Sequence, residues 1–524
     1  MTMKRLSGSG KEPHRKARPV GDVDPEKMMS VTVILRPRAK LKVGSAPISR
    51  QEFAAKFGAH PAEVAKVEEY AAAHHLSVHE VNIAARTITL RGRTGDMQKA
   101  FGVELKLFAT DDNKRFRGRE GHVFVPDDLH GIIEAVFGLD DRPAAKPHLR
   151  KLSISDLPTQ RRSSKREPKP MRVREVAKLY GFPARLDGSG QTIGMIELGG
   201  GFRKHDLDLF FKELGVESPA IAAVGVHGAT NDPGHEQLED GEVTLDLEIA
   251  GAVAPKAKYV VYFAPNTNAG FLAALNAAIH DDIRNPGIIS ISWGGPELTW
   301  TAASRKEVDY AMQAAAAMGV TVLAAAGDDG ASDGVDDGRP HVDFPASSPH
   351  VLACGGTRVI RASATKIAAE TVWNNGPTGN GAGGGGFSEF FPKPAYQKTL
   401  EVPRRGLPDI AGNADPHSGY RIVFGGKDVV AGGTSAVAPL YSALTALLNQ
   451  ARERAKLPPL GFINPVLYAE RDLCRNVLRK DNDYSGNLGV HKAGPGWNAC
   501  AGLGSVIGKK WVAIFTRETT ASAD

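Results

Sequence analysis

The sequence predicts a doubly wound α/β domain that follows a smaller α+β domain, and three observations support this prediction. Apolar runs alternate with helical stretches from about residue 175 onward, the apolar runs are nearly continuous, and a basic segment rich in proline precedes them. Near-continuous apolar runs are typical of parallel strands buried on both faces of a sheet. The apolar runs are 192–198, 258–265, 288–293, 320–327 and 350–356. The helical stretches lie near 205–214, 241–252, 269–282 and 304–318.

The smaller domain is expected over residues 31–140. Its elements follow the order strand, helix, strands, helix, strands, helix. The first strand is expected at 31–38, and the helices at 61–75, 94–102 and 127–139. This order of elements suits a ferredoxin-like fold.

Positive charge is concentrated in two short segments. The chain has a net charge of +6, and residues 1–20 hold six Lys or Arg against one Glu, while residues 141–174 hold eleven against three acidic residues. We expect a disordered basic tail over 1–30 and a protease-sensitive linker over 141–174, because such segments bury little apolar surface. The α/β domain then covers 175–524. A charged tail and linker do not form a basic face, so no nucleic-acid partner is expected.

Composition and apolar run lengths exclude some classes of protein. With 524 residues, 42% of them hydrophobic, the chain can bury a large core. No apolar run reaches the roughly 18 to 20 residues of a membrane-spanning helix, so no membrane partner is expected. The basic first residues lack a following apolar segment, which argues against a conventional signal peptide. Three cysteines are too few for a disulfide framework, although Cys474 and Cys500 could pair.

The segment GGTSAVAP (432–439) is the sharpest indication of chemistry. It places Ser435 on a glycine-rich turn before a helical run. Glycines allow a substrate to approach closely, and the helix dipole favours developing negative charge. A serine there could also be an ordinary N-cap. The pattern favours the nucleophile of a serine peptidase, and such a serine needs a general base.

Two candidates for that base occur. His227 lies in HGAT, but polar, turn-like residues follow it where an apolar helix would be expected. An apolar helix begins instead at GEVTLDLEIAGAVA (241–254), where Glu242 and Asp246 are four residues apart and share one face. A buried carboxylate pair that shares protons has raised apparent pKa values, which a glutamate base acting on serine needs. A solvated acidic face is the alternative.

Asp328 is a candidate for stabilising an oxyanion. It lies in AAAGDDG (324–330), at the end of an apolar run. Acyl transfer requires donors to the oxyanion, and a carboxylic acid can donate only while it is protonated. The role therefore demands an acidic working pH or a strongly raised pKa. An ordinary turn aspartate is the alternative.

Together these segments resemble the sedolisin family of serine-carboxyl peptidases, most closely its kumamolisin-like members. The resemblance covers about 175–510 and the order of elements before it. The segments that carry it are IELGGG, GEVTLDLE, YFAPNTNAGF, SISWGGPE, AAAGDDG, HVDFPASSP, GNADP, GGTSAVAP and AGPGW. It implies a subtilisin-like fold, activity at acidic pH and a zymogen whose prodomain inhibits the enzyme and is cut off at a linker.

The resemblance also assigns roles to individual residues. A Ser-Glu-Asp triad falls on Ser435, Glu242 and Asp246, and the oxyanion aspartate falls on Asp328. A glutamate and a tryptophan that extend the hydrogen-bond network correspond to Glu197 and Trp293.

One part of the family pattern is altered. Family members bind a calcium ion (Ca2+) near the C-terminus through two aspartates and backbone carbonyls. The aspartate positions are Asn476 and Asn498 here, and the carbonyl positions are Val477, Gly494 and Gly496. Because ligand charge tunes calcium affinity, we expect weak or absent calcium binding.

The sequence therefore predicts the zymogen of a monomeric, extracellular endopeptidase that hydrolyses protein or peptide substrates through an acyl-enzyme and removes its own prodomain. Two alternatives remain open. One is a subtilisin-like peptidase that uses His227, and the other is a catalytically silent polybasic binding protein with the same fold. The processing bond is not fixed by the sequence, although the basic segment 161–174 is its natural place.

Overall fold

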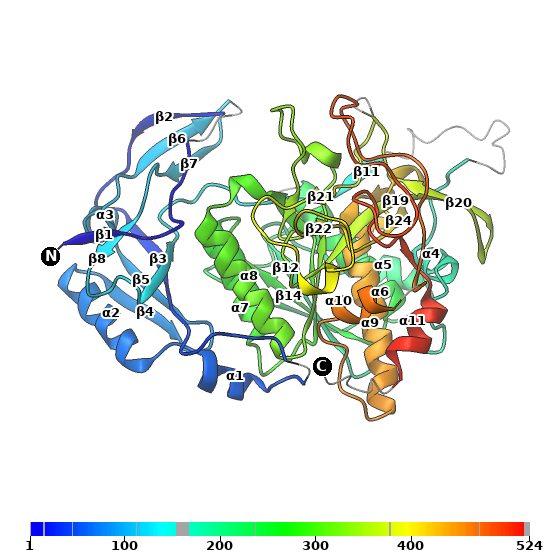
Figure 1. The fold of residues 1–524 in the computed structure, drawn as a ribbon, viewed down its shortest axis with the longest axis horizontal. Helices are drawn as coiled ribbons and strands as arrows, with labels where there is room; N and C mark the ends of the chain where they lie inside the picture. The colour runs from blue at the N-terminus through cyan, green and yellow to red at the C-terminus, as the bar shows by residue number, and fades with distance from the viewer. Residues whose placement is uncertain are drawn as a thin grey trace. The chain divides into compact units, whose positions relative to one another are not determined.

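The computed structural model describes residues 2–13, 16–44, 46–111, 113–152, 167–235, 237–376, 379–470 and 472–517. The chain forms two compact units (Figure 1). The first unit comprises Met1–Ala144, Pro265–Asp282 and Thr299–Met318, and the second comprises Ala145–Ala264, Ile283–Leu298 and Gly319–Asp524. The first unit thus combines the N-terminal region with two later helices, α7 (Asn268–Ile279) and α8 (Ala302–Ala317).

A ten-stranded sheet is the centre of the second unit. Its strands are β12 (Thr192–Glu197), β13 (Ile221–Gly225), β14 (Lys258–Phe263), β15 (Ile288–Ile291), β17 (Thr321–Ala325), β19 (Leu352–Ser363), β20 (Lys366–Val372), β23 (Ile410–Asn413), β26 (Cys474–Arg475) and β27 (Ser505–Val506). The order is β13-β14-β12-β15-β17-β19-β23-β27-β26, with β20 paired to β19. Neighbours from β13 to β27 are parallel, and β20 and β26 are antiparallel. Each apolar run in the sequence is therefore a strand, and the predicted α/β fold is confirmed.

Helices of the second unit pack against this sheet and against one another. They are α4 (Val173–Leu179), α5 (Lys204–Glu213), α6 (Gln237–Val253), α9 (Val437–Arg454), α10 (Asn464–Ala469) and α11 (Gly508–Phe515). Helix α9 contacts α6, β15 and β17. Every residue from Asp240 to Val253 of α6 is buried. Carboxyl groups on this helix from Asp240 onward are therefore shielded from water.

The first unit contains a four-stranded antiparallel sheet. Its strands are β3 (Met28–Leu35), β4 (Ser77–Asn82), β5 (Thr87–Arg93) and β9 (Ile133–Phe137), in the order β4-β5-β3-β9. Helix α1 (Arg50–Phe57) and helix α2 (Pro61–Ala73) separate β3 from β4, and helix α3 (Thr94–Phe101) follows β5. Apart from the additional α1 and the strands β6 (Lys106–Thr110), β7 (Arg115–Gly118) and β8 (Phe124–Pro126) between α3 and β9, this is the strand order and connection pattern of the ferredoxin-like fold, as the sequence predicted.

Two predictions for the N-terminal region are wrong. The helix predicted over 127–139 is instead strand β9, because pairing with β3 along Ile133–Phe137 buries most of that run. The tail predicted to be disordered over 1–30 contains β1 (Met3–Arg5) and β2 (Ala17–Asp22). They pair with β8 and β6, respectively, and β6 also pairs with β7.

The linker contributes two short strands to the second unit. Strand β10 (Lys146–Pro147) pairs with β16 (Trp293–Pro296), which pairs in turn with β18 (Asp343–Phe344). Strand β11 (Arg150–Leu152) pairs with β25 (Lys427–Gly432), next to β24 (Tyr420–Phe424). A further pair is β21 (Gly386–Phe387) with β22 (Gly406–Leu407). The linker predicted over 141–174 is thus ordered up to residue 152, and residues 153–166 lie outside the described residues.

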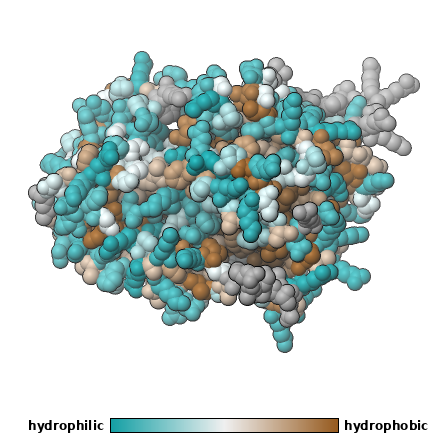
Figure 2. All heavy atoms as spheres, viewed as in Figure 1, coloured by the Kyte–Doolittle hydropathy of each residue, from teal (hydrophilic) through white to brown (hydrophobic). Residues whose placement is uncertain are grey.

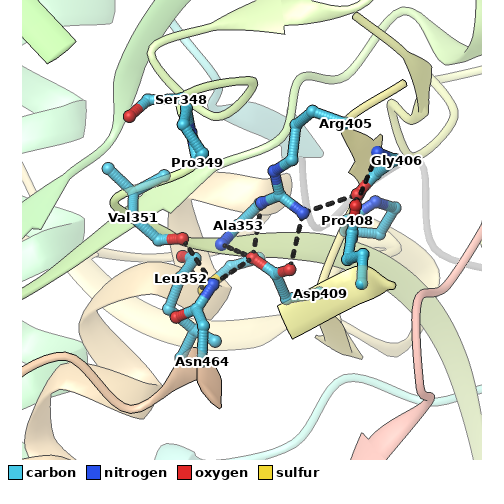
Figure 3. A network of polar contacts seen from close by, with 12 residues as sticks. Ser348, Pro349, Val351, Leu352, Ala353, Arg405, Gly406, Pro408, Asp409 and Asn464 are labelled. Carbon is cyan, nitrogen blue, oxygen red and sulfur yellow. Dashed lines mark hydrogen bonds and ion pairs between the residues drawn. The ribbon is translucent and has the colours of Figure 1, made fainter. Parts of the chain in front are cut away.

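A buried ion pair between Arg405 and Asp409 lies next to strand β19. Both side chains of Arg405 and Asp409 are fully buried, and their two nitrogen–oxygen contacts are each 2.7 Å (Figure 3). Asp409 also accepts hydrogen bonds from the amide of Ala353 at 2.7 Å and from Asn464 at 3.2 Å. Because the carboxylate is fully partnered, its charge is compensated inside the core.

The surface carries scattered hydrophobic residues among hydrophilic ones, as Figure 2 shows for one face. Among the described residues, Ile283 is the large hydrophobic residue with the greatest exposure, at 86%. In the part of the chain that the structure describes, no helix combines the length and the apolar character needed to cross a membrane.

Candidate active site

Ser435 lies at the start of helix α9, on the short turn Thr434–Ala436 that follows strand β25. Its side chain is fully buried, and its hydroxyl donates a hydrogen bond of 3.2 Å to the main-chain carbonyl of Ser292. Gly433 precedes the turn with φ at +100°. Glycine adopts this backbone conformation without a side-chain penalty, so the turn depends on it.

Three buried carboxyls lie together on two elements. Glu242 and Asp246 are one turn apart on α6, and Glu197 ends strand β12; all three are fully buried. The hydroxyl of Ser292 lies 2.9 Å from each oxygen of Asp246. The indole nitrogen of Trp293 donates to Glu197 at 2.8 Å. The structure thus brings together the residues that the sequence predicted for the triad and its extension.

Burial raises the pKa of each of these carboxyls. The pKa of Glu242 is raised first by burial and then by repulsion from Asp246 and Glu197. The pKa of Glu197 is raised by burial and by Asp246, and the pKa of Asp246 is raised by burial. The cluster therefore retains protons at a pH where exposed carboxyls are ionised.

Glu242 faces the serine without a hydrogen bond to it. The Ser435 hydroxyl offsets only part of the rise in the pKa of Glu242, and it donates its hydrogen bond to the carbonyl of Ser292. Both oxygens of Glu242 are buried and have no hydrogen-bond partner among the described residues. Catalytic hydrogen bonds often form only when substrate is bound for reaction, so this arrangement suits a resting serine.

Asp328 follows strand β17 and contacts the same turn. Its Oδ1 accepts hydrogen bonds from the amide and hydroxyl of Thr434, at 2.7 and 2.9 Å. Its Oδ2 lies 3.5 Å from Nε of Arg150 and has no hydrogen-bond partner among the described residues. Burial raises the pKa of Asp328, and the charges of Arg150 and His148 offset part of the shift. A protonated Oδ2 would be a donor directed at the serine turn.

The linker crosses this site as an extended strand. Between β10 and β11, the amide of His148 donates to the carbonyl of Ser292 at 3.1 Å. The carbonyl of His148 accepts a hydrogen bond of 3.1 Å from the amide of Ser435. A Cβ atom on Gly433 would overlap this carbonyl and lie 2.6 Å from Oδ2 of Asp328. The carbonyl of His148 is thus bound by the serine amide in the vicinity of Oδ2 of Asp328, as a scissile carbonyl would be.

Comparison with known proteins assigns the family. The chain is 45% identical to kumamolisin from Bacillus sp. (strain MN-32), over 96% of this chain and 94% of that protein. The chain is a kumamolisin-like member of the sedolisin family of serine-carboxyl peptidases. It is 28% identical to sedolisin from Pseudomonas sp. (strain 101), over 88% of this chain and 80% of that protein.

The N-terminal and C-terminal parts of the chain match two different family descriptions. Residues 15–142 match "Pro-kumamolisin, activation domain", and residues 221–460 match "Subtilase family". The solved structure of Pseudomonas sedolisin, a serine-carboxyl proteinase complexed with two molecules of pseudo-iodotyrostatin, aligns with a TM-score of 0.59 at 29% identity. It covers 66% of this chain and 98% of that one. The chain is therefore a serine-carboxyl peptidase zymogen with a subtilisin-like fold and an inhibitory prodomain.

In this chain, the residues at the expected calcium site do not suit the binding of a calcium ion. The side-chain oxygen of Asn476 accepts a hydrogen bond of 2.9 Å from the amide of Gly496. The side-chain amide of Asn498 donates to the carbonyl of Gly494 at 3.1 Å, and its oxygen accepts from two backbone amides further along the chain. A calcium ion needs oxygen ligands, and here the side-chain oxygens of Asn476 and Asn498 and the carbonyl of Gly494 are already engaged in hydrogen bonds. Among the described residues, no group of three or more His, Cys, Asp or Glu could hold a metal ion.

The surroundings of this loop are packed and charged in other ways. Val477 is fully buried in a small hydrophobic cluster with Cys500. Arg475 lies 3.4 Å from the carboxylate of Glu370. The three cysteines are free, so Cys474 and Cys500 do not pair in this structure. The loop is therefore closed by hydrogen bonds and packing.

Two residues of the site were not singled out in the sequence. Ser292 contacts Asp246, Ser435 and the linker, and its only sequence signal is its place before Trp293 at the end of an apolar run. His148 lies in a segment whose composition indicates a solvated linker, so the composition gave no sign that this residue is buried next to Ser435. His227, by contrast, is exposed on the turn after strand β13, whereas Ser435 is fully buried.

Proposed function

We propose that this sedolisin is the zymogen of an endopeptidase active in acidic medium, with Ser435 as nucleophile, Glu242 as general base and Asp246 as the residue that holds Glu242. One observation carries the proposal. The carbonyl of His148 accepts a hydrogen bond from the Ser435 amide next to Oδ2 of Asp328, so a peptide bond lies across the site in the position of a substrate.

In the first half of the reaction, the Ser435 hydroxyl turns from Ser292 to Glu242 and gives up its proton. Its oxygen attacks the carbonyl carbon, and the resulting oxyanion accepts from the Ser435 amide and from protonated Asp328. Glu242 then passes the proton to the leaving amine, which completes the acyl-enzyme. A water molecule releases the acyl group by the same roles in reverse.

The two carboxyl roles limit activity to a window of pH. Glu242 must be ionised to accept a proton, so activity falls as pH drops through the pKa of its cluster. Asp328 must be protonated to donate, so activity falls as pH rises through its pKa. Because burial raises both pKa values above those of exposed carboxyls, the window opens in acid but above the strongest acid range.

The same geometry suggests the bond that the zymogen cuts in itself. The carbonyl held by Ser435 belongs to His148, so the first cleavage would separate His148 from Leu149. The basic segment 161–174, favoured by composition, would be trimmed later; residues 161–166 lie outside the described residues.

Three further features follow the proposed function. The enzyme is proposed to be a monomer. It is also proposed to be secreted into an acidic medium, because its carboxyl groups must hold protons for it to work. It is proposed to need no calcium, since hydrogen bonds of Asn476 and Asn498 close the C-terminal loop. Its substrates are proteins or peptides, and its first substrate is its own linker.

Acid activation of the purified precursor tests this function. At about pH 4, where reference carboxyls begin to hold protons, we expect conversion of the precursor to a shorter form. Mass spectrometry should identify Leu149 as the N-terminus of the first product. The Ser435→Ala and Glu242→Gln variants should remain full length. Conversion of the Glu242→Gln variant at the rate of the unmodified chain would refute the assignment of the base, and loss of activity in His227→Ala alone would support a histidine-dependent enzyme instead.

A further inference from the structure

The linker strand presents three basic side chains to a group of aspartates near Ser435. Alternate residues of an extended strand point to the same side. Lys146, His148 and Arg150 occupy such alternate positions, and each of them contacts an aspartate. In substrate terms, with cleavage after His148, these are the positions P3, P1 and P2′, where P1 precedes and P1′ follows the scissile bond.

One aspartate binds two of these side chains from opposite sides of the scissile bond. Oδ1 of Asp329 accepts from a terminal guanidinium nitrogen of Arg150 at 2.7 Å, and Oδ2 contacts the ammonium group of Lys146. The same nitrogen of Arg150 also donates to the main-chain carbonyl of Asp328 at 3.3 Å. The side chain of Asp329 is 17% exposed while the linker is in place. The two oxygens of the Asp329 carboxylate therefore bind the side chains at P3 and P2′, one each.

The neighbouring aspartates differ from Asp329 in their charge state. Burial raises the pKa values of Asp328, Asp333 and Asp343, so these groups hold protons in acidic medium. Burial acts in the same direction on Asp329, but Lys146 and Arg150 outweigh it and lower its pKa. With the linker in place, Asp329 is thus the one of these four aspartates whose pKa is lowered, because it has two cationic partners.

We infer that Asp329 is a specificity-determining residue that selects substrates with Lys or Arg at P3, at P2′ or at both. This inference rests on the proposed function, because it takes His148 as the P1 residue. Once the linker has been cut and trimmed away, including Arg150, Asp329 has lost both of its basic partners. A basic peptide restores those contacts and the lowered pKa that they cause, whereas a neutral peptide leaves the side chain of Asp329 partly desolvated and without an ionic partner, which costs binding energy.

The linker sequence supplies the probe. A fluorogenic peptide with the sequence AAKPHLRKL, which is that of residues 144–152, is compared with versions carrying Ala at P3, at P2′ and at both. With the acid-activated enzyme at about pH 4, we expect kcat/KM to fall about tenfold for each replacement, mainly through KM. With Asp329→Asn, all four peptides should be cleaved with similar kcat/KM.

Two further measurements keep the outcome interpretable. Asp336→Asn removes a carboxylate from an exposed position of the same loop and should retain the full preference of the unmodified enzyme. Asp329→Lys should reverse the preference and favour a peptide with Glu at P2′. Preference retained in Asp329→Asn, or absent from the unmodified enzyme, would overturn the role of Asp329. Failure of every enzyme form to cleave any peptide would instead count against the proposed function.

Discussion

The amide of Ser435 donates a hydrogen bond of 3.1 Å to the carbonyl oxygen of His148, while the hydroxyl of the same serine donates to Ser292. The zymogen therefore holds a peptide bond at Ser435 without directing the nucleophile toward Glu242. Ser292 takes part in both contacts, because its carbonyl also accepts from the amide of His148. Activation then requires a small change at one hydroxyl group, together with the correct protonation of the carboxyl cluster.

The first prediction concerns Gly433. In Gly433→Ala the new methyl group would overlap the His148 carbonyl and lie 2.6 Å from Oδ2 of Asp328. It should displace any carbonyl from the serine amide and lower the rate of self-cleavage by at least about a hundredfold, the effect of losing one oxyanion donor. Gel analysis of the precursor in acid measures this rate.

A matched glycine separates this clash from backbone strain. Gly376 also has a positive φ, at +71°, but no atom lies within 4 Å of the position of its Cβ. Gly376→Ala should destabilise the fold slightly and leave self-cleavage in place. If both variants lose cleavage equally, the close approach at Gly433 is not the cause.

The second prediction concerns the alkaline limit of activity. The pKa of Asp328 is raised, so its proton is present below that pKa and is lost as pH rises through it. An asparagine donates at every pH. Asp328→Asn should lower kcat, because Asn is a different donor, but should move the alkaline limb of the kcat/KM profile upward by at least about one pH unit. An unchanged alkaline limb in this variant would show that another group sets the limit.

Much of the fold could be predicted because the strands of the central sheet are buried on both faces. Apolar runs such as 288–293 have few alternatives to a buried strand. The segment 127–139 was ambiguous, since its apolar residues fit a helix as well as a strand, and only pairing with Met28–Leu35 decides the outcome. Strand β2 carries almost no apolar signal because it is exposed at five of six positions.

The site was predictable only in part for a related reason. Ser435, Glu242 and Asp328 lie next to turns and helix starts that can be recognised locally. The contacts of His148 and Asp329 depend on where a polar linker runs in three dimensions, and no local pattern encodes that path. The segment whose composition most resembles a solvated spacer is therefore also the one that runs past Ser435.

The third prediction concerns calcium. In the unmodified chain, neither calcium nor a chelator should change the melting temperature, because Asn476 and Asn498 close the loop through hydrogen bonds. The double variant Asn476→Asp, Asn498→Asp loses the donor to Gly494 and gains two charges. It should melt lower without the ion and recover roughly 5 °C at a calcium concentration about a hundred times its dissociation constant. Differential scanning calorimetry of both chains, with magnesium as the control ion, checks this. A calcium-dependent rise in the unmodified chain would contradict it.

The fourth prediction concerns His280, at the end of helix α7 in the first unit. Its ring packs against Phe53 of helix α1, with the ring centres 5.6 Å apart, and its buried Nδ1 has no hydrogen-bond partner among the described residues. Burial lowers the pKa of His280 to about 4, and the positive charges of Arg50 and Arg86 add to this effect. On helix α8, Glu307 pairs with Arg86 at 2.8 Å and Tyr310 lies under its guanidinium group.

The direction of the pH effect follows from this lowered pKa. Well above a pH of about 6.5, the usual histidine pKa, the ring is neutral whether it is covered or exposed, and it does not make stability depend on pH. As pH falls toward 4, an exposed ring takes up a proton and the covered ring does not, so acid favours separation of α1 and Arg86 from α7. Acid should therefore loosen the N-terminal region from the two helices with which it forms a unit.

The variant His280→Asn, made in a Ser435→Ala chain that cannot cleave itself, tests this effect. The melting temperature of the parent should fall between pH 6.5 and pH 4, and His280→Asn should reduce the slope because its side chain does not titrate. His79→Asn, which replaces an exposed histidine of strand β4, should keep the parental slope. If His280→Asn and His79→Asn have the same slope, the loosening in acid comes from the carboxyl groups of the unit rather than from this histidine.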